Sequence, residues 1–505
     1  MEPHPTPHVV DGRPELRLDH SRAPVLEALA ECKRGMPGRN FTPPGHKQGA
    51  GVDARVRQVL GDGVFTSDVL VMSGLDDRRM SNGYLRRAQE LMADAVGAEH
   101  TFFSTCGSSL SVKSAMLSVA GPYDKLLVAR NAHKSVVSGL VLAGIQPVWV
   151  QPRWDAGHHF AHPPGPEEVR AAFARDPDAK GMVLISPTAY GSCADIRGVA
   201  EVCHERGRPL IVDEAWGAHL PFHPWLPSWA MDAGADVCVT SVHKMGAGLE
   251  QGSVFHLQGD LVDPVLLRMR EDLLGTTSPS VLVYAALDGW RRQMAEHGYE
   301  LLDAALGLAG RLRREIAALA GLVPLGAAEL IGPDRAFDHD PLALAVDVSG
   351  LGTSGYGAAD WLREYRQLNV GLADHRRIVA NLTHGDGEES CMDLLDALTE
   401  LVKQRDALPP PAGMRVPSPA GLEQDMVLLP RDAYFGPVEQ VPVEDAAGRI
   451  AAEYASPYPP GVPAVAPGER ISREAADYLR SGVRAGMYVP DAADASLRTL
   501  RVVAE

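Results

Sequence analysis

Short apolar, β-branched runs alternate with helix-like patterns through the middle of this chain. The runs fall at residues 101–104, 125–129, 147–150, 181–186, 209–213 and 235–240. Runs of this kind between turn signals are typical of buried strands in a parallel sheet. Helical segments lie between them, and in one of these Val199, Val202 and Cys203 recur at i, i+3 and i+4. The pattern predicts an α/β fold, a mostly parallel central sheet covered by helices on both faces.

The second half of the chain predicts two further domains. A long helical stretch at 298–320 precedes an alternating strand at 342–348 and helices at 358–367 and 393–403, which together indicate a small α/β domain. A proline-rich segment then separates this domain from a compact C-terminal α+β domain. The expected boundaries are 1–19 for a flexible tail, 20–305 for the major domain, 306–407 for the small domain, 408–420 for the linker and 421–505 for the C-terminal domain.

The composition is that of an ordinary globular protein with several domains. The 505 residues are 45% apolar and 22% charged, and 48 Lys+Arg against 65 Asp+Glu leave a net charge of −17. This balance argues against nucleic acid or an anionic membrane as a partner. Six cysteines are scattered without metal-ligand spacing, which is typical of a reduced compartment. Neither a signal peptide nor a membrane-spanning run is evident, so we expect a cytoplasmic location.

Two of the predicted strands end in residues that suit one cofactor. The run 209–213 ends in Asp213, and the run 235–240 leads into Ser241-Val-His-Lys244. The last residue of such a strand faces the crevice where open α/β sheets bind ligands. A lysine there can form a Schiff base with pyridoxal 5'-phosphate (PLP), and a carboxylate can keep the pyridine nitrogen protonated. A surface lysine and a solvated aspartate are the alternative for each residue alone, but the pair favours PLP.

A candidate phosphate site lies between a strand and a helix. Gly107-Ser108-Ser109 would offer backbone N–H groups, hydroxyls and a helix dipole to an anion. Ser109 is equally suited to be only a helix cap. Ser241, close before Lys244, can supply another hydroxyl to the same phosphate.

Histidines complete the candidate site. His133 opens a helix after the strand 125–129 and can stack on a flat aromatic cofactor, although a capping or surface histidine is the alternative. His243, beside Lys244, can bind substrate or transfer protons. His219 and His223 lack a carboxylate or cysteine to complete a ligand set, so no metal site is expected.

These residues lie in segments that resemble the Orn/Lys/Arg decarboxylases, PLP enzymes with the aspartate-aminotransferase fold (fold type I). The resemblance runs from about residue 20 to the C-terminus and matches the short form, which lacks the N-terminal receiver-like domain of the long enzymes. The segments that carry it are 101–152, Ser186-Pro-Thr-Ala-Tyr-Gly191, 212–219, 241–256, Arg130-Asn-Ala-His-Lys-Ser135, Phe41-Thr-Pro-Pro-Gly-His-Lys-Gln-Gly49, Pro457-Tyr-Pro-Pro-Gly-Val-Pro463 and Pro467-Gly-Glu469.

The resemblance implies roles for these residues. Lys244 would carry the cofactor, Asp213 would hold the pyridine nitrogen, and His133 would stack on the ring. The residues that would surround the phosphate, the Schiff base and the ring are Ser108, Ser109, Ser241, His243, Ala215 and Trp216.

Two further roles follow from the same resemblance. Thr277, in Thr276-Thr-Ser-Pro-Ser280, would reach the phosphate of a neighbouring subunit, which implies a homodimer or a multiple of dimers. Glu469 would lie near the distal cation of the substrate, although a loop glutamate is more often simply solvated.

Three positions depart from the family pattern. Cys106 stands where asparagine is usual, Met245 replaces a threonine, and Glu250 replaces a small hydroxyl residue. The expected reaction is decarboxylation of arginine, lysine or ornithine to an amine of polyamine biosynthesis, with Lys244 or His243 returning the proton. The departures leave open another PLP reaction, such as transamination. A non-catalytic protein with this fold is a third reading, against which the intact lysine and aspartate argue.

Overall fold

The computed structural model divides the chain into two compact units. The first comprises residues 1–115 and 213–302, and the second comprises 116–212 and 303–505. The residues that the structure describes are 9–10, 13–14, 18–35, 41–70, 75, 82–417, 421, 423–458 and 460–504. Most of the expected flexible tail and the end of the expected linker lie outside the described residues.

A seven-stranded, mostly parallel sheet runs in the order β3-β12-β11-β10-β8-β4-β5. Its strands are β3 (His100–Ser104), β4 (Lys125–Ala129), β5 (Gln146–Val150), β8 (Met182–Ile185), β10 (Leu210–Asp213), β11 (Val237–Ser241) and β12 (Ser253–Leu257). β4 pairs in parallel with β5 and β8, whereas β12 runs antiparallel to both β11 and β3. Each of the six predicted runs forms a strand of this sheet, which confirms the α/β prediction.

β12 is the strand that the sequence pattern does not reveal, because polar residues interrupt its apolar run. His256 is nevertheless 2% exposed. Its ring nitrogens lie 3.1 Å from Thr101 Oγ1 and 3.4 Å from Thr240 Oγ1, and its ring packs edge-on against Trp229. Ser253 donates to the carbonyl of Thr240 at 2.9 Å. Buried polar groups are tolerated when they are hydrogen-bonded in this way, so tertiary partners decide the strand.

In the first unit, α4 (Tyr84–Val96) packs on β3, and α1 (Pro24–Gly35) packs on α4. Leu85, Ala88, Met92 and Val96 recur at helical spacing on α4 and are buried, so one face of this helix is apolar. The unit's other elements are β1 (Val9–Val10), β2 (Arg13–Pro14), η1 (Lys47–Gly49), α2 (Ala54–Leu60), α3 (Asp62–Ser67), η2 (Leu220–Phe222), α9 (Val242–Met245) and α10 (Pro264–Leu274).

Two helices continue from one unit into the other. α5 (Gly107–Val119) follows β3, and α11 (Val281–Ala317) is a single helix of 37 residues. The sequence predicts only the later part of α11, from residue 298. Gly289 lies in the part that was missed, and glycine lowers the intrinsic helix preference of a segment.

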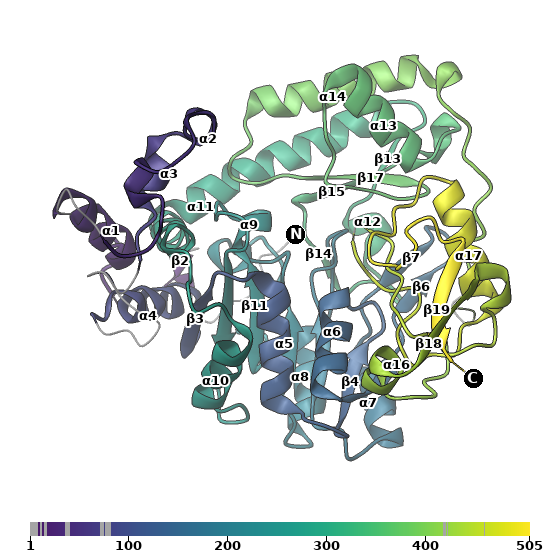
Figure 1. Cartoon of the computed structure of the whole chain (residues 1–505). Helices are drawn as coiled ribbons and strands as arrows, with labels where there is room; N and C mark the ends of the chain where they lie inside the picture. The colour runs from purple at the N-terminus through teal and green to yellow at the C-terminus, as the bar shows by residue number, and fades with distance from the viewer. Residues whose placement is uncertain are drawn as a thin grey trace. The chain divides into compact units, whose positions relative to one another are not determined.

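The second unit contains a small four-stranded sheet in the order β13-β15-β17-β16. Figure 1 shows α13 and α14 beside this sheet, in agreement with the predicted small α/β domain. These elements are β13 (Val323–Pro324), β15 (Ala343–Asp347), β16 (Leu372–Ala373), β17 (Arg377–Asn381), α13 (Gly355–Arg366) and α14 (Glu388–Lys403). The unit also contains β6 (Arg153–Asp155), β7 (Phe160–His162), β9 (Ser192–Cys193), β14 (Asp338–His339), α6 (Lys134–Ala143), α7 (Pro166–Arg175), α8 (Ile196–His204), α12 (Ala327–Leu330), η3 (Ser349–Leu351) and η4 (Arg405–Ala407).

The C-terminal part of the second unit has an apolar core of its own. Buried side chains from 443–502 form one cluster, which includes Val443, Ala475, Leu479 and Val502. Full burial of a large apolar side chain contributes about 1.5–3 kcal/mol, so this cluster stabilises the segment locally. Its elements are α16 (Pro430–Phe435), β18 (Val438–Pro442), η5 (Val443–Asp445), α17 (Arg473–Arg484) and β19 (Thr499–Val503). In Figure 1, α17 lies beside the β18–β19 pair.

Candidate active site

Lys244 lies in the first unit, in the short helix α9 that follows β11 directly. Its Nζ is 4.4 Å from the centroid of the Trp216 ring. Burial lowers the pKa of Lys244, and the carboxylate of Asp213 opposes this shift. A lowered pKa increases the fraction of neutral amine, which is the form that attacks an aldehyde.

Asp213 ends β10, the neighbour of β11 in the sheet. The residue is 5% exposed, and the backbone N–H of Ala215 donates to its Oδ1 at 3.2 Å. Burial raises the pKa of Asp213, and the charge of Lys244 and the hydrogen bond from Ala215 lower it. A buried carboxylate needs a positive or hydrogen-bonding partner, and a protonated ring nitrogen would supply one.

The candidate phosphate site has room for a ligand. Ser241 Oγ donates to Ser108 Oγ at 2.6 Å, and Ser108 lies in the first turn of α5. Gly107 has φ +75°, and a Cβ added there would meet no atom within 4 Å, so there is open space beside the start of the helix. Ser109 is exposed in the same turn. Backbone N–H groups and the dipole of α5 favour an anion here, so these residues fit the phosphate of PLP.

His243 is held by a backbone carbonyl. Its Nδ1 lies 3.2 Å from the carbonyl oxygen of Gly252, and because a carbonyl only accepts, Nδ1 carries the proton. Burial lowers the pKa of His243, and Glu250 opposes this shift. The neutral ring therefore keeps an acceptor at Nε2, which can take up a proton. Glu250, one of the departures from the family pattern, acts on this histidine through its charge.

The other expected site residues of the first unit differ in their exposure. Ala215 and Met245 are buried, Cys106 is half-buried, and its N–H donates to Ser104 Oγ at 3.3 Å. Thr277 is exposed in the loop between α10 and α11. Because Met245 is buried, a methionine in place of the usual threonine changes the packing beside Lys244 and adds no exposed group there.

His133 lies in the second unit, where it caps the N-terminus of α6. The backbone N–H of Ser135 donates to His133 Nδ1 at 3.2 Å, and Ser135 Oγ lies 2.9 Å from the same atom. His133 is therefore the N-cap of α6, which is the alternative role that the sequence allows for it. Because Nδ1 accepts a hydrogen bond, the neutral ring carries its proton on Nε2.

Glu469, also in the second unit, is fully buried and ion-paired. Arg130 donates from Nε and Nη2 to its two oxygens at 3.1 and 3.0 Å, and the N–H of Ala466 donates at 2.8 Å. Burial raises the pKa of Glu469 and Arg130 lowers it. Because both oxygens are engaged, the geometry favours a structural role over the expected substrate contact. Arg130, which the sequence reasoning did not single out, is the missed partner.

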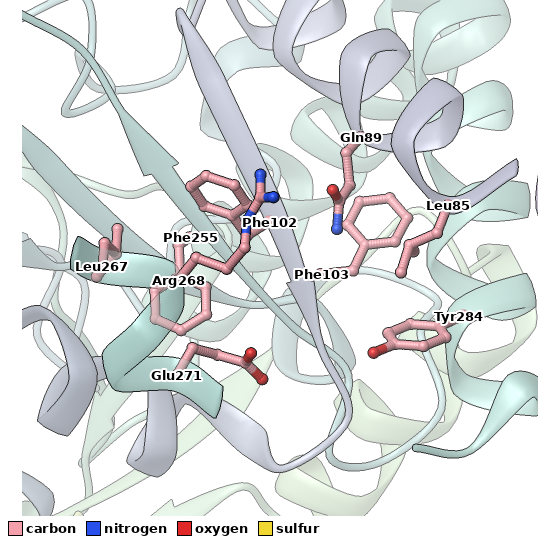
Figure 2. Close-up of a pocket in the computed structure, with 9 residues that line it drawn as sticks. All are labelled: Leu85, Gln89, Phe102, Phe103, Phe255, Leu267, Arg268, Glu271 and Tyr284. Carbon is pink, nitrogen blue, oxygen red and sulfur yellow. The ribbon is translucent and has the colours of Figure 1, made fainter. Parts of the chain in front are cut away.

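A separate pocket lies in the first unit (Figure 2). Arg268 lies over the ring of Phe102 there, 5.2 Å from its centroid. None of the expected site residues lines this pocket. Its lining residues are Leu85, Gln89, Phe102, Phe103, Phe255, Leu267, Arg268, Glu271 and Tyr284.

The histidines near Trp216 pack as structural residues. His219 and His223 are buried, and His223 stacks on Tyr299 with the ring centroids 4.7 Å apart. Within the described part of the chain, no group of three or more His, Cys, Asp or Glu side chains is arranged to hold a metal ion.

A lysine with a lowered pKa, a buried carboxylate on the neighbouring strand and an open helix N-terminus fit a PLP-binding site on an α/β sheet. Sequence profiles agree with this class. Residues 23–340 match the major domain of the Orn/Lys/Arg decarboxylases, and residues 420–490 match their C-terminal domain. The chain belongs to the Orn/Lys/Arg decarboxylase family, whose PLP-dependent members are carbon–carbon lyases that decarboxylate basic amino acids.

Similar proteins cover nearly the whole chain. It is 40% identical over 468 residues to an arginine decarboxylase of Halalkalibacterium halodurans, which covers 92% of this chain and 94% of the relative. It is 36% identical over 491 residues to an arginine decarboxylase of Bacillus subtilis, covering 97% and 99% of the two chains. These matches confirm the resemblance and the expected decarboxylation.

Solved structures confirm the fold. The lysine decarboxylase of Francisella novicida aligns with a TM-score of 0.81 at 20% identity, covering 95% of this chain and 81% of that one. The ureidoglycine–glyoxylate aminotransferase of Bacillus subtilis aligns with a TM-score of 0.53 at 14% identity, covering 70% and 91%. The expected aminotransferase-type fold is therefore correct.

Replacing Lys244 tests the site directly. Lys244→Ala removes the amine that would bind the aldehyde, so we expect loss of PLP retained after borohydride reduction and a fall in kcat of about 10²–10⁴-fold. Mass spectrometry of the reduced protein measures the first effect. Lys180→Ala, at a lysine with a 41% exposed side chain, should leave both unchanged. Covalently retained PLP in Lys244→Ala would contradict this assignment.

Proposed function

We propose that this chain decarboxylates L-arginine, giving agmatine and CO₂. The observation that carries the choice is the 36–40% identity, over more than nine-tenths of the chain, to proteins named arginine decarboxylases. The family as a whole acts on ornithine, lysine or arginine, so arginine is the finer step of the proposal. The proposed role for the product is in polyamine biosynthesis.

The proposed chemistry divides between the cofactor and the chain. Bound PLP supplies an electron sink for the electron pair left on Cα when CO₂ departs. Asp213 keeps the ring nitrogen protonated, because a buried carboxylate is stabilised by a positive partner. Lys244 would hold the cofactor through its amine, and the released amine would hold a proton near Cα of the substrate. His243, with its acceptor at Nε2, is the second candidate for moving that proton.

The remaining roles position the cofactor. We propose that Ser108, Ser109 and Ser241 bind the phosphate, with hydroxyls and backbone N–H groups at the start of α5. Ala215 and Trp216 pack beside the ring. We further propose that His133 stacks on it, which is supported by the family resemblance and by the fixed orientation of the imidazole.

A product assay tests the proposed substrate. PLP-loaded protein is incubated separately with arginine, lysine, ornithine and a panel of neutral and acidic amino acids, while CO₂ and amine are followed by mass spectrometry. We expect CO₂ and agmatine from arginine, with kcat/KM at least about tenfold above lysine and ornithine. A site built to pair a forked guanidinium discriminates against a point-like ammonium. Cadaverine or putrescine as the preferred product would contradict the proposal.

We also propose that the chain works as a homodimer or a multiple of dimers. The outer face of α10 carries an apolar stripe of Val265, Met269 and Leu273, which are 64%, 59% and 68% exposed. Exposed apolar stripes of this kind are typical of interaction surfaces. The stripe leads into the loop with Thr277, the residue proposed to reach the phosphate of a second subunit.

Light scattering tests this assembly. We expect the mass of two chains or a multiple, and we expect Met269→Asp to shift it toward one chain, because a charge in an apolar interface is costly. Met392→Asp is the matched control, since Met392 is also 59% exposed but lies on α14. A one-chain mass for the unmodified protein would refute the dimer.

Two broader expectations remain proposals. We propose a cytoplasmic location, which the scattered cysteines support, and the five-part division of the chain at residues 19, 305, 407 and 420. Among the described residues, no helix combines the length and apolarity needed to cross a membrane.

A further inference from the structure

The C-terminal segment 457–469 contacts the loop that carries His133. This loop, Arg130–His133, connects β4 to α6, and both segments belong to the second unit. The same helix is held at its other end, where Arg431 donates to the carbonyl of Leu142 at 3.0 Å and α16 packs on α6 (Figure 1). The C-terminal part of the chain thus contacts α6 at both of its ends.

The start of the loop is fixed by the buried Arg130–Glu469 ion pair. Arg130 also donates from Nη1 to the carbonyl of Pro463 at 2.7 Å, and its guanidinium lies over the ring of Trp149. An ion pair with both oxygens engaged and added backbone acceptors has a single geometry. Arg130 therefore ties the loop to the C-terminal segment at a defined position.

The end of the loop is fixed by Gly461. The N–H of Lys134, the first residue of α6, donates to the carbonyl of Gly461 at 2.8 Å, which satisfies a helix N–H that has no partner within the helix. The N–H of Gly461 in turn donates to the carbonyl of Pro457 at 2.9 Å. Lys134 Nζ lies 5.6 Å from the centroid of the Tyr458 ring and 3.7 Å from Asp491 Oδ2.

Gly461 also lies next to the imidazole of His133. A Cβ added at Gly461 would lie 3.0 Å from both Cδ2 and Nε2 of His133, and 3.1 Å from Cδ2 of Tyr458. Ordinary carbon contacts are longer than this, so any side chain would push the ring edge. The ring is thus held at Nδ1 by Ser135, and its opposite edge faces Gly461, where a side chain would not fit.

We propose that Gly461 is a positioning residue for His133: the C-terminal segment sets the tilt of the imidazole through direct contact at Gly461. The proposal rests on the proposed function, in which His133 stacks on PLP. Through this contact the C-terminal domain would influence cofactor binding, because it fixes the loop that carries His133. Glu469 serves the same arrangement, because its pair with Arg130 fixes the register of the segment against the loop.

The test is Gly461→Ala, whose methyl group would press on the His133 ring. We expect weaker PLP binding by about two- to tenfold, because a displaced ring stacks poorly. We also expect an altered visible circular dichroism of bound PLP and a fall in kcat of about ten- to 10²-fold from misalignment. PLP affinity and circular dichroism are read without turnover.

Gly448→Ala is the matched control. Gly448 lies in the same C-terminal region with φ +90°, against +88° at Gly461, so alanine suffers the same backbone strain at both positions. A Cβ at Gly448 would meet no atom within 4 Å. Wild-type PLP affinity, circular dichroism and kcat in Gly448→Ala would assign the Gly461 effects to the His133 contact. Equal effects in the two variants would overturn the proposal.

A double substitution separates this proposal from the proposed function. In a His133→Ala background, Gly461→Ala should cause no further change in PLP affinity, because the ring that it displaces is gone. If His133→Ala itself leaves PLP affinity and circular dichroism unchanged, the stacking role fails, and this inference fails with it. If His133→Ala alters them but Gly461→Ala does not, only the positioning role of Gly461 is refuted.

Thermal melting guards against a variant that does not fold. If Gly461→Ala does not melt cooperatively but Gly448→Ala does, Tyr458→Ala is used in place of Gly461→Ala. Tyr458 is 45% exposed and packs against the position of Gly461, so its loss should be tolerated. We then expect a smaller change of the PLP circular dichroism that disappears in the His133→Ala background, and no change would overturn the proposal.

Discussion

The pairing of the buried Asp213 with the half-buried Lys244 is the interaction on which the site depends. Each group alone would be disfavoured in its charged form, which is why burial raises the pKa of the acid and lowers that of the lysine. Each also opposes the other's shift through its opposite charge. The sheet makes this pairing possible, because β10 and β11 are neighbours and each delivers one residue at or just after its end. The order of the strands thus brings the amine of Lys244 and the carboxylate of Asp213 to neighbouring positions in the sheet.

Two histidines belong to the proposed site, and hydrogen bonds set their tautomers in opposite ways. His133 accepts a hydrogen bond at Nδ1, so its proton lies on Nε2, whereas His243 donates from Nδ1 to the carbonyl of Gly252 and keeps an acceptor at Nε2. The first ring is therefore suited to packing with a set orientation, and the second to accepting a proton. Backbone groups set both tautomers, so the protonation pattern of each ring depends on loop geometry as well as on residue type.

The sequence predicts the parts of this structure that depend on local pattern. Apolar runs reveal six strands of the sheet, and strand ends reveal Asp213 and Lys244, because ligand-facing positions follow from the order of strand and helix. The sequence does not predict β12, since the burial of His256 depends on tertiary partners such as Thr101, which lies 155 positions away. The sequence does not predict the partner of Glu469 for the same reason. Arg130 lies 339 positions away, and only folding brings the two side chains together.

The coupling between Asp213 and Lys244 is best measured through the ionisation of Lys244 in PLP-free protein. The rate at which Lys244 forms a borohydride-reducible adduct with pyridoxal, measured against pH, reports its pKa because only the neutral amine reacts. We predict a Lys244 pKa below the ordinary lysine value, and a still lower one in Asp213→Asn, because loss of the carboxylate removes what stabilises the ammonium. Asp263→Asn, which alters only the cap of α10, should match the unmodified protein. A Lys244 pKa at the ordinary value, or one unmoved by Asp213→Asn, would show that the two groups do not interact as described.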